Sequence, residues 1–129
     1  LTAIGDVMPL RPRATGVVTK NGKVLLVTDR GRDRYSLPGG GIQPGELPIS
    51  AVARELYEET GLRADKIELV FTHRSRSQEH VVFLISAHHG RARPRNEIDA
   101  HLWWDGEADI ALFPHVRVIL AHPKISAAI

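Results

Sequence analysis

Residues 40–62 read GGIQPGELPISAVARELYEETGL, and this stretch decides the fold. It predicts a helix over residues 48–60, because core-facing side chains recur at spacings of three and four, which places them on one helix face. Those side chains are Ile49, Val52, Ala53, Leu56 and Thr60. Pro48 suits the first turn of a helix, and Gly61 suits the residue that follows the last turn.

The predicted helix also carries three carboxylates on one side. Glu55, Glu58 and Glu59 are spaced i, i+3, i+4, so they project from the same face. Like charges this close disfavour a helix, whereas a divalent cation would reverse that cost, and all-oxygen ligands suit Mg²⁺ or Mn²⁺. Taken alone, the triplet is more typical of a solvated acidic face on which Arg54 pairs with Glu58, because glutamate is a common helix former.

The wider spacing favours the metal site. Five residues separate Gly40 from Glu46, seven more separate Glu46 from Arg54, and the stretch ends Arg54-Glu55-Leu56-Tyr57-Glu58-Glu59-Thr60-Gly61-Leu62. This matches each fixed position of the Nudix box, G-x5-E-x7-R-E-U-x-E-E-x-G-U, where U is aliphatic. The chain therefore resembles the MutT-like members of the Nudix hydrolase superfamily. The resemblance implies an α/β fold, a Nudix-type α/β/α sandwich with a mixed β-sheet and a catalytic loop–helix–loop.

The resemblance further implies roles for the residues of the box. Glu58 and Glu59 correspond to the principal metal ligands, and Glu55 to a ligand that also serves as the base or orients it. Arg54 corresponds to a residue that orients the glutamates, and Glu46 to a supporting acid. We expect these residues to hold Mg²⁺ or Mn²⁺ as the cofactor.

Two further ligands are implied outside the helix. The carbonyl group of Gly40 would complete the metal shell. In the family, another acid comes from a later loop, a few residues before a tryptophan. We expect Glu97, which precedes Trp103, with Asp99 and Glu79 as alternatives.

Strand patterns flank the box on both sides. Residues 15–20 and 23–29 are β-rich and enclose Asn21-Gly22, which predicts a type I′ hairpin. Further strands are predicted over residues 67–72, 80–87 and 98–104, with a short extended piece over 35–37 and a second helix over 114–122. Strands interrupted by two helices predict an α/β sandwich with a mixed sheet.

The whole chain, residues 1–129, is predicted to form one domain. It lacks cysteine, which excludes disulfides and thiolate metal sites. Its net charge of +2 does not indicate binding to a nucleic-acid duplex. No apolar run is long enough to span a membrane and no signal peptide is visible, so we expect a cytoplasmic protein, either a monomer or a homodimer.

Arginines gather in two segments that we expect to bind substrate. One segment precedes the glycine run and the other lies between two predicted strands. The candidate substrate-binding residues are Arg30, Arg32, Arg34, Tyr35, Arg74 and Arg76. Guanidinium groups bind phosphate through paired hydrogen bonds, although solvated loops rich in arginine would show the same pattern.

The leading hypothesis is therefore Mg²⁺- or Mn²⁺-dependent hydrolysis of a phosphoanhydride bond. The substrate would be a nucleoside diphosphate linked to another group X, and the products would be a nucleoside monophosphate and phosphorylated X. Alternatives are a diphosphoinositol polyphosphate or dinucleoside polyphosphate hydrolase and, outside enzymes, a Nudix-fold sensor domain that binds nucleotides without catalysis. The last is disfavoured because the box keeps every glutamate.

Overall fold

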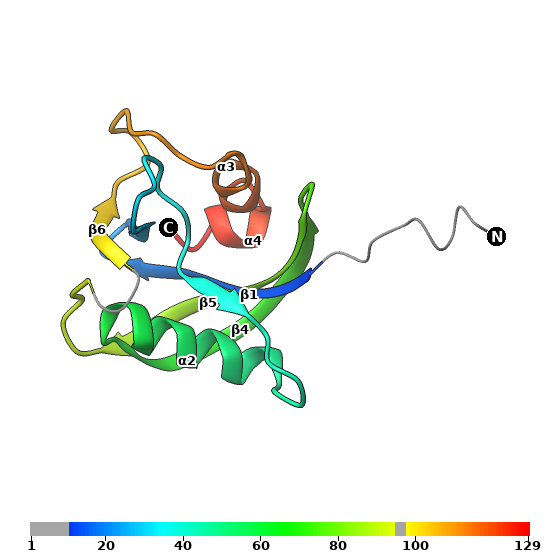
Figure 1. Ribbon diagram of the computed structural model, residues 1–129. Helices are drawn as coiled ribbons and strands as arrows, with labels where there is room; N and C mark the ends of the chain where they lie inside the picture. The colour runs from blue at the N-terminus through cyan, green and yellow to red at the C-terminus, as the bar shows by residue number, and fades with distance from the viewer. Residues whose placement is uncertain (1–10, 95–97) are drawn as a thin grey trace.

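The fold is described by a computed structural model over residues 11–94 and 98–129, without the side chain of Asp99. One mixed sheet has the strand order β4-β5-β1-β2-β6 (Figure 1). The strands are β1 (Arg11–Lys20), β2 (Lys23–Asp29), β4 (Arg63–Arg74), β5 (Gln78–His89) and β6 (Ile98–Trp104). β1 and β5 are parallel, and the other neighbours are antiparallel. The predicted α/β class and mixed sheet are confirmed.

The β1–β2 hairpin forms where the sequence predicts it. Asn21 and Gly22 both have positive φ angles, of 51° and 76°, as a type I′ turn requires. β1 begins at Arg11, earlier than predicted, because it pairs with β5 in parallel from Arg11↔Gln78 to Val18↔Ile85. The residues at 11–14, which the prediction omitted, are polar or small, so their own sequence carries little strand signal.

A short strand, β3 (Gly39–Gly41), is absent from the prediction. It pairs antiparallel with β1, from Thr15↔Gly39 to Arg13↔Gly41. Three glycines in a row do not indicate a strand. Close approach explains Gly39, because a Cβ there would lie 2.1 Å from the carbonyl oxygen of Ala14, at a φ of 149°. Glycine therefore lets the chain lie against β1 immediately before the helix.

Helices cover both faces of the sheet (Figure 1). Helix α2 (Pro48–Thr60) packs against one face through a cluster that includes Val18, Leu25, Val52 and Leu56. Helices α3 (Pro114–Leu120) and α4 (Pro123–Ser126) lie on the other, over a second cluster that includes Val17, Leu26, Val116 and Ile119. This is the expected sandwich. Alternate residues of β1 and β2 serve opposite clusters, as the pleat requires.

The two tryptophans of β6 also separate as their adjacency predicts. Trp104 is buried in the α3-side cluster, and Trp103 packs at the edge of the α2-side cluster. Along the part of the chain that the structure describes, no helix is both long enough and apolar enough to cross a membrane.

Helix α2 has the predicted bounds but a slightly rotated buried face. Ala51, Val52, Leu56 and Thr60 are buried, whereas Ile49 is 43% exposed, so its predicted place in the apolar stripe is wrong. The first turn projects beyond the sheet, where tertiary packing does not cover it. Gly61 ends the helix with a φ of 80°, and its N–H donates to the carbonyl oxygen of Tyr57.

Three other boundaries differ from the prediction. β4 and β5 are both longer, joined by a turn in which the N–H of Ser75 donates to the carbonyl oxygen of Gln78 over 2.8 Å. The second helix ends at Leu120, and Pro123 begins α4. Polar ends of paired strands have no hydrophobic alternation, so cross-strand pairing sets their length rather than local sequence.

Candidate active site

Arg54 is the centre of the polar network on α2. Its Nε and Nη2 donate to the two carboxylate oxygens of Glu46, over 2.7 and 2.9 Å. Its Nη1 lies 2.9 Å from Oε1 of Glu55 and 3.3 Å from Oε2 of Glu58. Nη2 also donates to the carbonyl oxygen of Gly41 over 3.2 Å. One guanidinium thus joins the loop before the helix, strand β3 and two of the three clustered glutamates.

The electrostatics of the network follow from these contacts. The hydrogen bonds from Arg54, helped by the N–H of Gln43, lower the pKa of Glu46 to about 2. Glu46 in turn raises the pKa of Arg54 above its usual range. Both groups therefore remain charged at physiological pH. Part of the repulsion expected among the glutamates is therefore offset by this arginine.

Glu59 lies apart from the arginine and faces the sheet. Its Oε1 accepts a hydrogen bond from the N–H of Gly39 over 3.0 Å. Burial raises the pKa of Glu59 to about 8, against the opposing influence of that N–H and of Arg13. At neutral pH this carboxyl group is therefore mostly protonated when no cation is bound, and a bound cation would favour its charged form.

Glu55 lies against strand β3. A Cβ built on Gly40 would lie 2.4 Å from Cδ of Glu55, so only glycine leaves room for this carboxylate. Gly39 and Gly40 therefore contact the two inner glutamates, one by a hydrogen bond and one by close packing. The two glycines therefore position the carboxylates of Glu55 and Glu59 against strand β3.

The donor set fits a divalent cation. Glu55, Glu58 and Glu59 supply only oxygen, which suits Mg²⁺ or Mn²⁺. The burial of Glu59 with a single N–H partner also favours a bound cation, because a cation would stabilise the charged form of this carboxyl group. Within residues 11–94 and 98–129, no three Asp, Glu or His side chains are gathered into a ready-made metal cluster, since Arg54 holds two of the glutamates. The ligand roles of these residues and of the Gly40 carbonyl group stay predictions.

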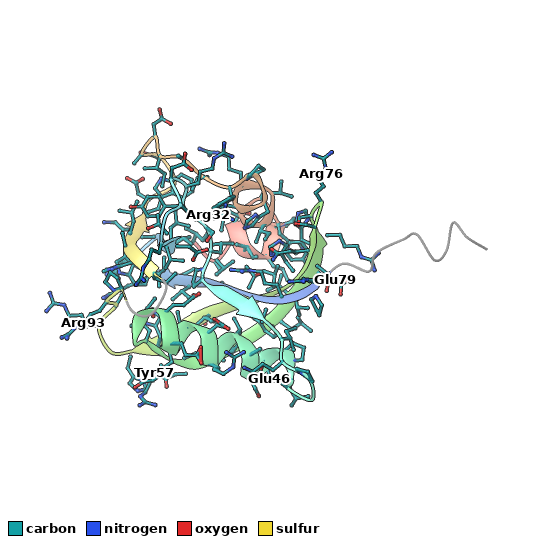
Figure 2. The ribbon with its side chains drawn as sticks, in the orientation of Figure 1. Arg32, Glu46, Tyr57, Arg76, Glu79 and Arg93 are labelled. Carbon is teal, nitrogen blue, oxygen red and sulfur yellow. The ribbon has the colours of Figure 1, made fainter. Side chains whose placement is uncertain are left out.

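The three candidates for the additional acid have different locations. Glu97 lies outside the described residues. Asp99 lies in β6, and its side chain is not described. Glu79 lies in β5, where its carboxylate is 3.2 Å from Nε of Arg74. That ion pair gives Glu79 a partner at the β4–β5 end, and Figure 2 shows it well away from Glu46.

A polar cavity of 320 Å³ lies next to this acidic region. Arg13 and Asp29 line it, and both are close enough to Glu59 to influence its pKa. The described residues that line it are Arg13, Asp29, Arg32, Ser36, Ser75, Ser77, Gln78, Phe113 and His115. The volume falls in the range of about 300–1,000 Å³ that small-molecule sites have.

Arg13 and Arg32 give the cavity its positive charge. Arg13 donates from Nη2 to the carbonyl oxygen of Leu37 over 3.3 Å, while its buried Nε has no hydrogen-bond partner among the described residues. Arg32 lies over the ring of Phe113, with Cζ 5.3 Å from the ring centroid. Both guanidinium groups are thus held near the cavity, and Arg13 retains an unused donor.

Two uncharged histidines, His80 and His115, lie beside the cavity. The rings of His80 and His115 stack with centroids 4.6 Å apart, and Nδ1 of His80 is 2.9 Å from Oγ1 of Thr15. Burial, followed by the nearby cations, lowers the pKa of His80 to about 3 and that of His115 to about 4. At neutral pH these imidazoles add no charge, so the two arginines and Asp29 set the charge of the cavity.

The structure places the predicted substrate-binding residues in different surroundings. Of the six, Arg32 lines the cavity. Tyr35 packs against the α3-side cluster, and Arg74 pairs with Glu79 at the end of β4. Arg76 lies at the tip of the β4–β5 turn and points away from the molecule (Figure 2). Arg30 and Arg34 are exposed on the segment after β2. The two arginine segments do meet, because Ser75 and Ser77 share the cavity with Arg32.

Several residues that line the cavity were not among the predicted substrate-binding residues. Arg13 is one of several arginines near the start, and nothing local distinguishes it. Phe113 and His115 flank the first residue of α3, in a segment far from the box. Phe113 and His115 line the cavity only because the fold brings α3 over β1. Residue spacing in the sequence does not predict this long-range contact.

Comparisons with known proteins agree with this geometry. The family model for the NUDIX domain matches residues 10–119. The crystal structure of a protein from Chromobacterium violaceum, described as a nudix hydrolase family member, is similar with a TM-score of 0.78 and 36% identity, over 88% of this chain and 76% of that one.

Two curated relatives match over shorter stretches. An RNA pyrophosphohydrolase of Tolumonas auensis is 39% identical over 59 residues, which cover 46% of this chain and 34% of that protein. A MutT-like protein of Streptomyces ambofaciens is 34% identical over 89 residues, which cover 67% of this chain and 58% of that protein. The chain thus spans less than two thirds of either relative.

Proposed function

The chain belongs to the Nudix domain family, and from this premise we propose that it hydrolyses a phosphoanhydride bond with Mg²⁺ or Mn²⁺. The single observation that carries the proposal is the position of the ionisable carboxyl of Glu59 beside Arg13 and the polar cavity. A carboxylate cluster for a cation and a cationic cavity for phosphates are then neighbours. Two relatives whose names are RNA pyrophosphohydrolase and MutT-like protein support the same class of reaction.

The residues of the chain would divide the work as follows. Glu55, Glu58 and Glu59 would hold the cation, which lowers the pKa of a bound water and offsets the negative charge of the phosphates. Arg54 orients Glu55 and Glu58 through its Nη1. Glu59 or Glu55 would take the proton of the attacking water. All four residues lie on α2, where Arg54 contacts Glu55 and Glu58, and a bound cation would draw the three carboxylates together.

The substrate would lie across the cavity with its phosphates toward the acidic helix. Arg13 and Arg32 would bind phosphate oxygens beyond the bond that is cut, and Phe113 and His115 offer flat rings to the group X. We therefore propose a nucleoside diphosphate derivative as the substrate, with a nucleoside monophosphate and phosphorylated X as products.

A second candidate is a substrate with a longer phosphate chain. Two arginines beside one cavity favour it, and so does the likeness of the box region to RNA pyrophosphohydrolases. Dinucleoside polyphosphates, diphosphoinositol polyphosphates and the 5′-triphosphate end of a single RNA strand share this chemistry. A hydrolysis panel should contain all of these together with ADP-ribose and nucleotide sugars.

The decisive experiment measures phosphate or nucleotide release with Mg²⁺ and after EDTA. We expect turnover of at least one substrate, loss of turnover in EDTA and recovery with added Mg²⁺. Glu58→Gln and Glu59→Gln should each lower kcat by about a hundredfold or more, since each removes a ligand charge. The matched control is Glu68→Gln, on the exposed surface of β4, which should retain normal kcat. Turnover that survives complete chelation would refute the proposal, and nucleotide binding without turnover would favour the sensor alternative.

A further inference from the structure

A second cavity lies on the α2 face of the sheet, at the C-terminal end of the helix. Its volume is 440 Å³, within the range of about 300–1,000 Å³ for small-molecule sites. The side chains that define it are those of Lys20, Leu62, His88, Arg91, His101 and Trp103. None of them lines the polar cavity beside Glu59.

The position of Trp103 separates this cavity from the acidic site. Trp103 pairs with Leu25 across the β2–β6 ladder, whereas Asp29, which lines the polar cavity, lies four residues further along β2. Four residues of strand correspond to about 13 Å. Leu62 closes the cavity beyond the end of α2, past the glutamates. The cavity is therefore a separate site.

Trp103 is held as a partly exposed aromatic surface. The ring of His88 stacks on it at 5.8 Å between centroids and an angle of 18°, and Nε2 of His88 is 3.2 Å from the carbonyl oxygen of Thr19. Lys20 places Nζ 5.8 Å from the Trp103 centroid. A partly exposed indole that is already held by such contacts loses little entropy when a flat ring packs against it.

The charge of the cavity is positive. Lys20 and Arg91 both line it, and neither is paired with a carboxylate that the structure describes. No acidic side chain is among the lining residues that the structure describes. His101 adds ring nitrogens that make no hydrogen bond to another described residue. An aromatic surface, two cations and polar ring nitrogens together match a flat base that carries an anionic group.

We propose that this cavity, which we call the Trp103 pocket, is a second binding site for a purine nucleotide, separate from the site of hydrolysis. The base packs against Trp103 and Leu62, and Lys20 and Arg91 bind the phosphate. This site needs no metal and no turnover, so it stands or falls independently of the proposed reaction.

Tryptophan fluorescence tests the proposal directly. The chain has two tryptophans, and Trp104 is buried in the cluster on the opposite face. AMP titrated in EDTA should quench Trp103 saturably. Adenosine and inorganic phosphate, each lacking half of the ligand, should bind at least about tenfold more weakly, since each loses either the stacking contact or the charge-assisted contact.

Variants separate this pocket from the polar cavity. Lys20→Ala and Arg91→Ala should each raise the Kd for AMP by about five- to tenfold, with less effect at high salt. Trp103→Leu should abolish the quench, and equilibrium dialysis of AMP with this variant should show the loss of one bound nucleotide. Arg32→Ala, in the other cavity, should leave the quench unchanged. Unfolding curves verify that each variant is folded.

Three outcomes would overturn the proposal. They are no saturable quench, equal quenching by adenosine and AMP, or a quench that is lost in Arg32→Ala but kept in Lys20→Ala and Arg91→Ala. The last would place AMP in the polar cavity. Failure of hydrolysis with an intact quench would instead reject the proposed reaction and keep the Trp103 pocket.

Discussion

Arg54 contacts Glu46, Glu55, Glu58 and the Gly41 carbonyl oxygen with one planar group. A lysine carries the same charge but has no fork with which to reach four acceptors at once. The arrangement of its hydrogen-bond donors therefore matters more at this position than its positive charge. The ion pair expected of an ordinary acidic face is present, since Arg54 and Glu58 are paired i, i+4 at 3.3 Å, and the metal site stays a prediction.

Arg54→Lys should lower kcat by about 10–100-fold while leaving the protein folded, as loss of a group that orients metal ligands usually does. Steady-state kinetics over a Mg²⁺ titration would show a higher Mg²⁺ requirement for the variant. The control is Arg63→Lys, which alters an arginine stacked on Tyr57 of the same helix, at 4.5 Å, outside the carboxylate network. Normal kinetics in Arg54→Lys would show that charge alone suffices.

His80 gives a prediction on pH. Its pKa in the folded protein is about 3, below its usual 6.5, so the unfolded chain binds a proton between these values and the folded protein does not. The free energy of unfolding should therefore fall as pH drops from about 6.5 toward 3, by roughly 2–3 kcal/mol at pH 4.5. His115, shifted the same way, would add to this fall.

His80→Gln should reduce that loss of stability in acid, although it is expected to be less stable than the parent at pH 8. Urea unfolding at pH 8, 6 and 4.5 measures both effects. Thr15→Val removes the hydrogen-bond partner but keeps the imidazole, so it should retain the acid sensitivity. An identical pH dependence in His80→Gln and the parent would exclude His80 as its source.

At the scale of elements, β3 is the piece that joins the acidic helix to the sheet. The space around its glycines differs: a Cβ on Gly40 would clash with Glu55, whereas a Cβ on Gly41 would meet nothing within 4 Å.

Gly40→Ala should displace Glu55 and lower kcat by about a hundredfold, because a misplacement near 1 Å has a cost of this size. Gly41→Ala is the matched control and should be nearly neutral. Equal activities would show that Glu55 can reposition freely.

The elements also show how far the sequence predicts this protein. Helix α2 and the β1–β2 hairpin follow from local signals, namely periodicity, a proline, a stop glycine and Asn21-Gly22. Strand β3 does not, because its glycines adopt a strand only against β1. The acidic half of the site was predictable because it lies within one stretch. Of the two cations beside the cavity, Arg32 was predicted and Arg13 was not, because β1, the segment after β2, the β4–β5 turn and α3 line this cavity jointly.

At the scale of the whole molecule, a small net charge conceals a strong local asymmetry. Acidic side chains concentrate on α2, and guanidinium groups gather at the neighbouring cavity. The sheet is what brings the two together, since Arg13 lies on β1 at the pairing with Gly41 of β3. Substrates are therefore expected to be selected by the number and placement of their phosphates.

This arrangement predicts that kcat/KM rises from ADP-linked substrates to those with longer phosphate chains, because each added phosphate meets a further cation. Arg32→Ala should raise KM for the longer substrates by about five- to tenfold and change kcat little, since it would remove binding shared by ground state and transition state. The preference should also weaken as salt rises, because the cavity is open to solvent.

Arg76→Ala is the matched comparison, because Arg76 carries the same charge on the adjacent turn but points away from the molecule (Figure 2). If contact rather than general attraction selects the substrate, Arg76→Ala should leave both constants within about twofold of the parent while Arg32→Ala does not. Equal rises in KM for the two variants would instead show that the surface field as a whole attracts phosphates. A flat kcat/KM across chain lengths, unchanged in Arg32→Ala, would show that this arginine serves only to cover Phe113, where its guanidinium already lies 5.3 Å from the ring.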